Sequence, residues 1–171
     1  MPRLRLISAT PADASALAAL RNTVADDLTA RHGRGRWSAH CTERGVLADL
    51  RHGRVYLRRV RRRIVATLTL QTRKPWAIDR SYFTPVKRPL YLINMAVAPG
   101  YQRLGLGRAC LADVTALARR WPADAIFLDA FDHPAAGADP FYAKCGYREA
   151  GRVNYRGTKL DYYELLLGGP T

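Results

Sequence analysis

The spacing of apolar residues predicts that helices and strands alternate along this chain. Between Pro11 and Arg31, apolar residues recur every three or four positions, which predicts a helix. These positions are Leu17, Leu20, Val24 and Leu28. Thr10 can cap this helix and Pro11 suits its first turn, while Ser38 is expected to cap a second helix that reaches Leu50.

Short runs rich in apolar and β-branched residues predict strands. These runs cover residues 3–7, 54–60, 64–70, 90–97, 125–131, 147–153 and 160–167. The second and third runs are predicted to form a hairpin, and two more helices are expected over residues 105–120 and 139–144. The order of these elements predicts a mixed α+β sheet that is covered by helices on both faces.

The segment from residue 72 to residue 89 has no clear periodicity and contains three prolines, Pro75, Pro85 and Pro89. A long connection in a compact domain is often functional. Its aromatic residues either line a substrate entrance or cover an edge of the core, and the sequence favours neither. These residues are Trp76, Tyr82 and Phe83.

Length and composition favour one domain over residues 1–171, since 171 residues with 48% hydrophobic content can bury a substantial core. The longest apolar run, Leu90–Ala98, is too short to span a bilayer, and polar residues after Arg5 interrupt any signal-peptide core. The three cysteines are scattered and lack metal-binding spacing. We therefore expect a cytoplasmic protein with reduced thiols, no membrane association and no bound metal.

The net charge of +14 is large, and 24 of the 28 basic residues are arginine. Arginine suits phosphate recognition, so the charge is compatible with an acidic cofactor or a nucleic acid. The arginines are spread along the chain, however, and no nucleic-acid-binding motif is visible. Arg58, Arg59, Arg61, Arg62 and Arg63 form one dense cluster beside the predicted hairpin turn, where solvated side chains are expected.

The most informative segment is residues 95–108. A predicted strand runs into Pro99-Gly100, and Gln102-x-x-Gly105-x-Gly107 then precedes a helix. The first N–H groups of a helix have no intrahelical partners and lie at the positive end of its dipole, so they bind phosphate oxygens. Glycine lets a ligand approach the backbone and permits a positive φ.

Two other phosphate-binding motifs fit this segment poorly. Gly100 and Gly105 have P-loop spacing, but Leu106-Gly107 stands where Lys-Ser/Thr is required. Gly105-x-Gly107-x-x-Cys110 approaches a dinucleotide fingerprint, and Asp129 lies near the distance of its ribose-binding acid. The third glycine is missing, and too little chain remains for the further βα units.

The segment resembles the pyrophosphate loop of the GNAT acyltransferase superfamily, whose pattern is Gln/Arg-x-x-Gly-x-Gly/Ala after a strand reading Val-x-Pro. A second segment, Asp139-Pro-Phe-Tyr-Ala-Lys-Cys-Gly-Tyr147, resembles the superfamily's Phe-Tyr-x-Lys-x-Gly-Phe. The order and spacing of the two segments also match, and the resemblance is strong over residues 90–150. The position that is often Asn in the family is Ala135 here, so one side-chain contact to the cofactor is missing.

The resemblance implies a mostly antiparallel sheet of about six to seven strands, splayed at a cleft that binds acetyl-CoA. The backbone of Met95, Ala96 and Val97 would pair with the pantetheine amides like an added strand. Further cofactor contacts are implied for Gln102, Arg103, Leu104, Gly105, Leu106, Gly107, Arg108, Phe141 and Tyr142. Leu104 and Leu106 are expected to pack their side chains while their amides bind.

Acyl transfer to an amine needs a proton acceptor and a proton donor. A lysine-like amine has a pKa near 10.4, so about one molecule in a few thousand is neutral at pH 7. Tyr142 resembles the family's general acid, because a phenol with a pKa of about 10 stays protonated at pH 7 and can donate to the departing thiolate. The base remains open among Asp129, Asp132 and a water chain.

Other residues offer alternatives for the base and for acceptor binding. Asp26, Asp27 and Glu43 on the first two helices could act as bases or attract a cationic acceptor, and His133 follows Asp132. A covalent route through Cys110 or Cys145 is less favoured, because small buried cysteines are usually inert.

The sequence therefore predicts an N-acetyltransferase that moves an acetyl group from acetyl-CoA to a primary amine of a small molecule or peptide. The amine would attack directly in a ternary complex. Two alternatives are a catalytically silent acyl-CoA-binding regulatory domain and, ranked last, a basic nucleic-acid-binding module. The sequence indicates no particular acceptor, and it is compatible with a homodimer.

Overall fold

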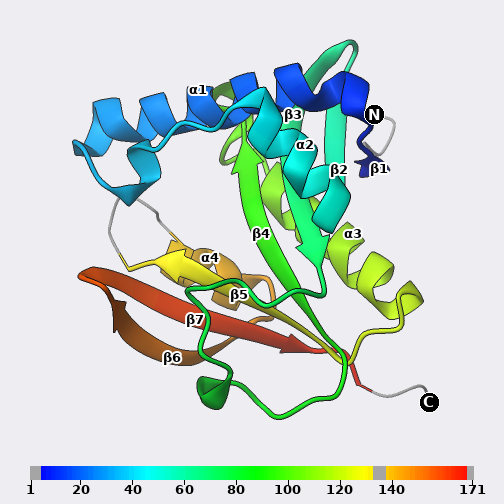
Figure 1. The fold of residues 1–171 in the computed structure, drawn as a ribbon, viewed down its shortest axis with the longest axis vertical. Coiled ribbons are helices and arrows are strands. Elements are labelled where there is room, and N and C mark those ends of the chain that lie inside the picture. Colours follow the sequence, from blue (N-terminus) through cyan, green and yellow to red (C-terminus); the bar gives the residue numbers. More distant parts are fainter. Residues whose placement is uncertain (1–4, 133–137, 169–171) are drawn as a thin grey trace. The chain divides into compact units, whose positions relative to one another are not determined.

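The computed structural model describes residues 5–132 and 138–168. Over these residues the strands form a sheet in the order β1-β2-β3-β4-β5-β7-β6 (Figure 1). Strand β4 pairs with β5 in parallel, whereas β1–β2, β2–β3, β5–β7 and β6–β7 are antiparallel. The predicted mixed, mostly antiparallel sheet is therefore confirmed. The chain divides into two compact units, and each contributes part of this sheet.

The first unit comprises the chain up to Leu70 together with Asn94–Asp113. Its elements are β1 (Ile7–Ser8), α1 (Ala14–His32), α2 (Glu43–His52), β2 (Arg54–Val60), β3 (Arg63–Gln71), the end of β4 (Pro89–Val97) and the start of α3 (Leu106–Arg120). Short 3-10 turns precede α1, α2 and α3: η1 (Pro11–Asp13), η2 (Arg36–Ser38) and η4 (Pro99–Tyr101). The predicted helix after Thr10 and the predicted hairpin are both confirmed.

Helices cover both faces of β2 in this unit. Val55 and Leu57 pack with Leu17 of α1 and Val46 of α2 in one core. The next residue, Arg58, points to the opposite face because side chains alternate along a strand. There its guanidinium meets α3, so the helices predicted on both faces are present in this unit.

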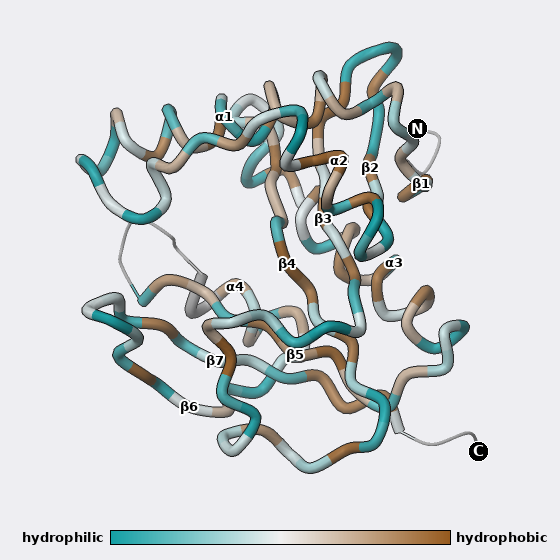
Figure 2. The backbone as a smooth tube through the Cα atoms, viewed as in Figure 1, coloured by the Kyte–Doolittle hydropathy of each residue, from teal (hydrophilic) through white to brown (hydrophobic). Residues whose placement is uncertain are grey.

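Burial of Arg58 corrects the expectation of a fully solvated arginine cluster. Only 3% of Arg58 is exposed, and its Nη2 donates to the Asp113 carboxylate at 2.6 Å and to the Ala109 carbonyl at 3.1 Å. The backbone N–H of Leu6 donates to the same Asp113 oxygen at 2.9 Å. The tip of the hairpin itself is hydrophilic, as expected (Figure 2).

The start of α2 also differs from the prediction, since Thr42 and not Ser38 caps this helix. The Thr42 hydroxyl accepts a hydrogen bond from the Gly45 N–H at 3.1 Å. Ser38 lies in η2, where its hydroxyl contacts Thr29 at 2.6 Å and accepts from Gly35 N–H. The segment after Ser38 is held on α1, so the helix starts four residues later than Ala39. The predicted strand 3–7 is likewise reduced to Ile7–Ser8, and its first two residues lie outside the described range.

The second unit comprises Gln71–Ile93 and the chain from Val114 onward. Its elements are η3 (Arg80–Tyr82), the start of β4, the end of α3, β5 (Ala125–Phe131), α4 (Ala138–Lys144), β6 (Arg148–Tyr155) and β7 (Thr158–Leu166). Strand β5 has the predicted bounds, and the other strands and α-helices agree with prediction to within two residues, whereas η3 was not predicted.

The connection between β3 and β4 forms part of the core of the second unit. Ala77, Ile78 and Phe83 pack with Phe127 and Tyr162, and the Phe83 ring stacks on the Phe127 ring at 4.4 Å. Phe83 is thus a core residue. Trp76 and Tyr82, in contrast, remain 67% and 46% exposed.

Candidate functional site

The glycine segment of the first unit forms a turn that is fixed at both ends. Pro99 begins η4, and the Ala98 N–H donates to the Val65 carbonyl at 2.8 Å. The side-chain amide of Gln102 reaches back to the Val97 carbonyl at 3.0 Å. Gln102 therefore shapes the loop through its side chain, a role that the motif alone does not reveal.

Gly105 adopts a backbone conformation that glycine favours, with φ of +80°. Its carbonyl accepts the first bond of α3, from the Ala109 N–H at 3.0 Å. The N–H groups of Leu106, Gly107 and Arg108 therefore precede the first residue with an intrahelical acceptor. A β-carbon at Gly105 would meet no atom within 4 Å, so space is open beside this helix start.

Side chains around this turn divide into exposed and packed groups. Arg103 and Arg108 are exposed, and Arg103 has a positive φ of 60°. Leu106 packs against the core of the first unit, as expected. Leu104 does not pack, because 74% of it is exposed, which corrects the prediction for this side chain. Two cationic side chains therefore flank the free N–H groups, which suits an anionic ligand.

A distortion in β4 precedes Met95, Ala96 and Val97. Asn94 has a positive φ of 54° and donates from its side chain to the Asp49 carboxylate at 3.2 Å. Asp49 on α2 also accepts from Arg21 on α1 at 2.7 Å. Sequence reasoning missed this feature, although Asn tolerates positive φ and is the lone polar residue in an apolar strand. The parallel pairing of β4 with β5 covers Pro89–Tyr91.

Tyr142 lies on α4 in the second unit, together with Phe141. The Tyr142 ring contacts those of Tyr147 and Tyr163 at centroid distances of 5.8 and 5.3 Å. Gly146, with φ of +89°, follows the helix and turns the chain into β6. The segment that resembles the family motif thus holds a tyrosine among aromatic rings.

Burial raises the pKa of Tyr142 above its ordinary value of 10.0, and the nearby Asp129 carboxylate and Cys145 raise it further. The phenol therefore stays protonated across the neutral range and can act as a proton donor. Tyr147 next to it has a hydroxyl that is buried without a hydrogen-bond partner among the described residues. No sequence signal distinguished Tyr147 from an ordinary core tyrosine.

The two carboxylates proposed as bases in this unit lie in different environments. Burial raises the pKa of Asp129 above its ordinary 3.8, and its charge affects both Tyr142 and Tyr162. Asp132 is exposed and its backbone N–H donates to the Lys159 carbonyl at 3.0 Å. Asp129 is thus the carboxylate that shares an environment with Tyr142. His133 and Ala135 lie outside the described residues.

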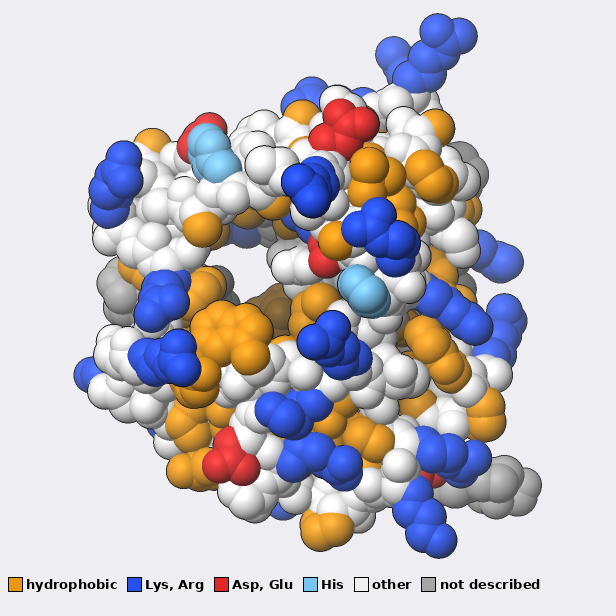
Figure 3. Space-filling view, viewed as in Figure 1, with side chains coloured by type: hydrophobic (Ala, Val, Ile, Leu, Met, Phe, Trp, Pro, Cys, Tyr) orange, Lys and Arg blue, Asp and Glu red, His pale blue; other side chains and the backbone are white. Residues whose placement is uncertain are grey.

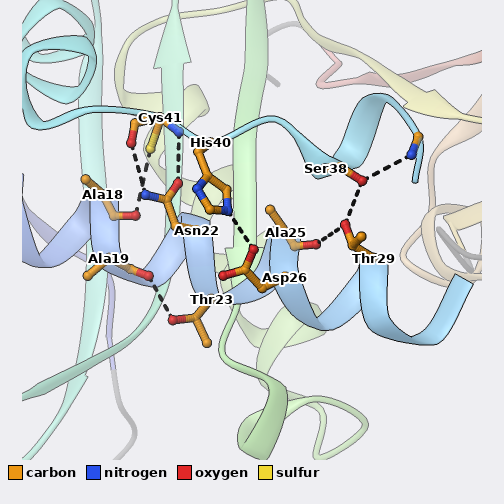
Figure 4. Close-up of polar contacts among 11 residues, drawn as sticks. Ala18, Ala19, Asn22, Thr23, Ala25, Asp26, Thr29, Ser38, His40 and Cys41 are labelled. Carbon is orange, nitrogen blue, oxygen red and sulfur yellow. Dashed lines mark hydrogen bonds and ion pairs between the residues drawn. The ribbon is translucent and has the colours of Figure 1, made fainter. Parts of the chain in front are cut away.

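Two of the three acidic candidates on the first two helices have local partners, and Figure 4 shows the contact of Asp26. Asp26 contacts the His40 ring at 2.6 Å, and Asp27 forms an ion pair with Arg31 four residues later. The segment that carries His40 is itself fixed on α1, because the Asn22 amide bonds both the N–H and the carbonyl of Cys41. Glu43 occupies the first turn of α2, where the positive end of the helix dipole stabilises a carboxylate.

Cys110 does not have the environment of a reactive thiol. Cys110 is 1% exposed, and burial raises the pKa of its thiol to about 11. A thiol with this pKa is almost entirely protonated at neutral pH and is a poor nucleophile. Within the described residues, no three His, Cys, Asp or Glu side chains are grouped to hold a metal, and no helix is long and apolar enough to cross a membrane.

Comparison with known proteins shows one matching family model and several similar solved structures. The model of the acetyltransferase (GNAT) family matches residues 18–147. The ribosomal-protein-S18-alanine N-acetyltransferase of Escherichia coli is 20% identical, with a TM-score of 0.72 over 97% of this chain and 95% of that one. The ribosomal-protein-alanine N-acetyltransferase of Brucella melitensis is 19% identical, with a TM-score of 0.72 over 96% and 100%.

A third similar structure, from Salmonella typhimurium, was solved with acetyl-CoA as its cofactor. It is 17% identical, with a TM-score of 0.69 over 97% of this chain and 95% of that one. A search of the curated proteins gives no match to this sequence. At these identities the solved structures establish the fold alone.

Proposed function

Because this chain belongs to the GNAT acetyltransferase family, we propose that it transfers an acetyl group from acetyl-CoA to a primary amine of a small molecule or peptide. The whole chain would act as one catalytic domain. The amine attacks the thioester carbonyl directly in a ternary complex, since the thiol of Cys110 is buried and protonated.

The observation that carries this proposal is the open helix start at Gly105. Three consecutive N–H groups, those of Leu106, Gly107 and Arg108, have no intrahelical acceptor, and a β-carbon at the preceding Gly105 would meet no atom within 4 Å. These groups suit the pyrophosphate of acetyl-CoA, and Arg103 and Arg108 add positive charge beside it. The backbone of Met95, Ala96 and Val97 would hold the pantetheine amides.

Tyr142 supplies the proton that the leaving thiolate needs. Its raised pKa keeps the phenol protonated until the thiolate of CoA begins to form. The neighbouring ring of Phe141, at a centroid distance of 5.1 Å, helps to keep water away from the phenol. The hydroxyl of Tyr147 is available to a substrate group in the same environment.

Asp129 is the base that this environment favours. A carboxyl whose pKa is raised by burial is better matched to proton acceptance near neutral pH than an exposed one. It would take a proton from the substrate ammonium, directly or through one water, and so leave the neutral amine that attacks the thioester carbonyl. Asp132, in contrast, is exposed to solvent.

Acetyl-CoA titration and thiol release across an amine panel test the proposal. We expect acetyl-CoA to bind and at least one amine to release free thiol. Tyr142→Phe should lower kcat by about 10²–10⁴-fold while the acetyl-CoA Kd changes little. Tyr155→Phe removes a hydroxyl elsewhere in the second unit and should leave both values near those of the native protein.

The outcomes separate the alternatives. Binding of acetyl-CoA without thiol release for any amine would identify a silent regulatory domain. Absence of acetyl-CoA binding to folded protein would refute the assignment of the Gly105 turn. A Tyr142→Phe variant with native kcat would leave the acid to another group.

A further inference from the structure

The second unit contains a cavity of about 630 Å³ that is separate from the residues assigned to acetyl transfer. The connection between β3 and β4, the first residues of β4 and the turn after α3 form its walls. Its charged lining residues are Lys74, Arg80, Lys87 and Arg88, and its aromatic ones are Tyr91 and Trp121. This volume lies within the range of about 300–1,000 Å³ that is typical of ligand pockets.

Among the described residues that line this cavity, four carry basic side chains and none carries a carboxylate. Arg88 is the one that has a carboxylate partner, since its Nη2 donates to Asp124 at 2.9 Å. Figure 3 shows several basic side chains on the face that the 72–89 connection occupies. The other three basic side chains, those of Lys74, Arg80 and Lys87, therefore give the cavity a positive charge that no described lining residue neutralises.

Two of these three cations are held in place by backbone carbonyl groups. The Lys74 ammonium donates to the carbonyls of Pro75 and Ile78 at 3.0 and 2.7 Å. Arg80 donates to the Val86 carbonyl at 2.8 Å. A carbonyl positions a cation without cancelling its charge, so both groups are preorganised for an anion. The connection contains one acidic residue, Asp79. Its carboxylate accepts hydrogen bonds from the N–H and the hydroxyl of Ser81, and the charge of Lys74 is the smallest of the influences on its pKa.

The same cavity is also lined by aromatic and apolar side chains. Tyr91 is buried at 1% exposure, and Trp121 is half-buried at the end of α3. Burial raises the pKa of Tyr91 and the positive charge of Arg80, which lines the same cavity, counteracts this effect. A ring or sugar can therefore lie against these side chains while an attached anionic group faces the cations.

We propose that this cavity binds a nucleoside di- or triphosphate, with its phosphates on Lys74, Arg80 and Lys87 and its base against Trp121. Three cations call for more than one anionic group on the ligand, because a single phosphate can face only one or two of them. The size of the cavity suits one nucleotide better than a nucleic-acid strand. This function goes beyond acetyl transfer and uses none of its residues.

Calorimetric titration of the native protein with ATP, ADP and AMP, in saturating acetyl-CoA and at constant ionic strength, tests the proposal. We expect affinity to fall from ATP to ADP to AMP, because each phosphate removed loses a charge-assisted contact. Lys87→Glu is the informative variant, since the Lys87 side chain forms no hydrogen bond or ion pair with the described residues and its replacement should not disturb folding. It should weaken ATP binding at least about tenfold and leave acetyl-CoA affinity unchanged.

Arg119→Glu is the matched control, because Arg119 is an exposed arginine near the same end of α3 that does not line the cavity. It should change ATP affinity by less than about twofold. The proposal is overturned by absence of heat with all three nucleotides, or by equal losses in Lys87→Glu and Arg119→Glu. Tighter binding of a single-stranded RNA oligonucleotide than of ATP would also overturn it, in favour of a nucleic-acid surface.

Discussion

Replacing Gly105 separates two effects that the structure assigns to this residue, which are backbone conformation and access to the helix start. With φ of +80° and no atom within 4 Å of an added β-carbon, Gly105→Ala is penalised by its backbone alone. A left-handed conformation costs a non-glycine residue about 1 kcal/mol. For a chain of this size, that lowers Tm by about 2–4 °C. Asn tolerates positive φ better, so Gly105→Asn should lose about half as much stability.

Acetyl-CoA affinity should follow the opposite order. The side chain of Asn extends further than that of Ala into the open space beside the N–H groups of residues 106–108. We therefore expect Gly105→Asn to weaken acetyl-CoA binding more than Gly105→Ala, although it is the more stable protein. Thermal unfolding and calorimetric titration of the three proteins give the two orders.

Gly157 is the matched control for the conformational effect. It has φ of +84° in the β6–β7 turn and no atom within 4 Å of an added β-carbon. Gly157→Ala and Gly157→Asn should show the same order of stability as the Gly105 variants, with no change in acetyl-CoA affinity. The reasoning is refuted if affinity at Gly105 falls in the same order as stability, or if the Gly157 variants lose affinity equally.

Three further predictions concern buried polar groups. Because burial raises the pKa of Asp129 above 3.8, the group favours folding at low pH, and this contribution is lost as pH rises through its folded pKa. The stability of Asp129→Asn relative to the native protein should therefore increase as the pH rises above 3.8 in denaturant titrations, and the variant should lose the acidic limb of the kcat profile. A difference in stability that does not change with pH would contradict the shift. Asp113→Ala leaves Arg58 buried without its carboxylate and should lower the free energy of unfolding by about 3 kcal/mol, whereas the double variant Arg58→Met/Asp113→Leu should recover most of that loss. A loss under about 1 kcal/mol for Asp113→Ala in urea unfolding would show that solvent already screens the pair. Tyr147→Phe removes a buried hydroxyl without a partner and should leave the free energy of unfolding unchanged or raise it, so a loss above about 1 kcal/mol would reveal a hydrogen bond.

Local signals in the sequence determined the order of the elements and the turn at Gly105. Helical periodicity, the Thr10-Pro11 start and the alternation of hydrophobic runs act between residues close in the chain, so their outcome can be predicted without tertiary contacts. The Gly105 turn belongs to the same class, because the positive φ and the free N–H groups both arise from the helix start itself.

Residues whose role depends on distant partners could not be placed in this way. Arg58 was expected in solvent, yet a carboxylate 55 positions later draws it into the protein. Thr42 replaces Ser38 as the cap because Asn22 on α1 holds the intervening segment extended. Leu104 was expected to pack and is exposed, since no neighbouring element covers it.

The choice between Asp129 and Asp132 shows the same division. Both carboxylates end the same predicted strand, and the sequence supplies no reason to prefer one. Burial of Asp129 beside the aromatic residues of the second unit raises its pKa, whereas Asp132 stays in water. Desolvation depends on everything packed around a group, so only the tertiary structure can set it, whereas hydrogen-bonding geometry within one turn is already fixed by the sequence.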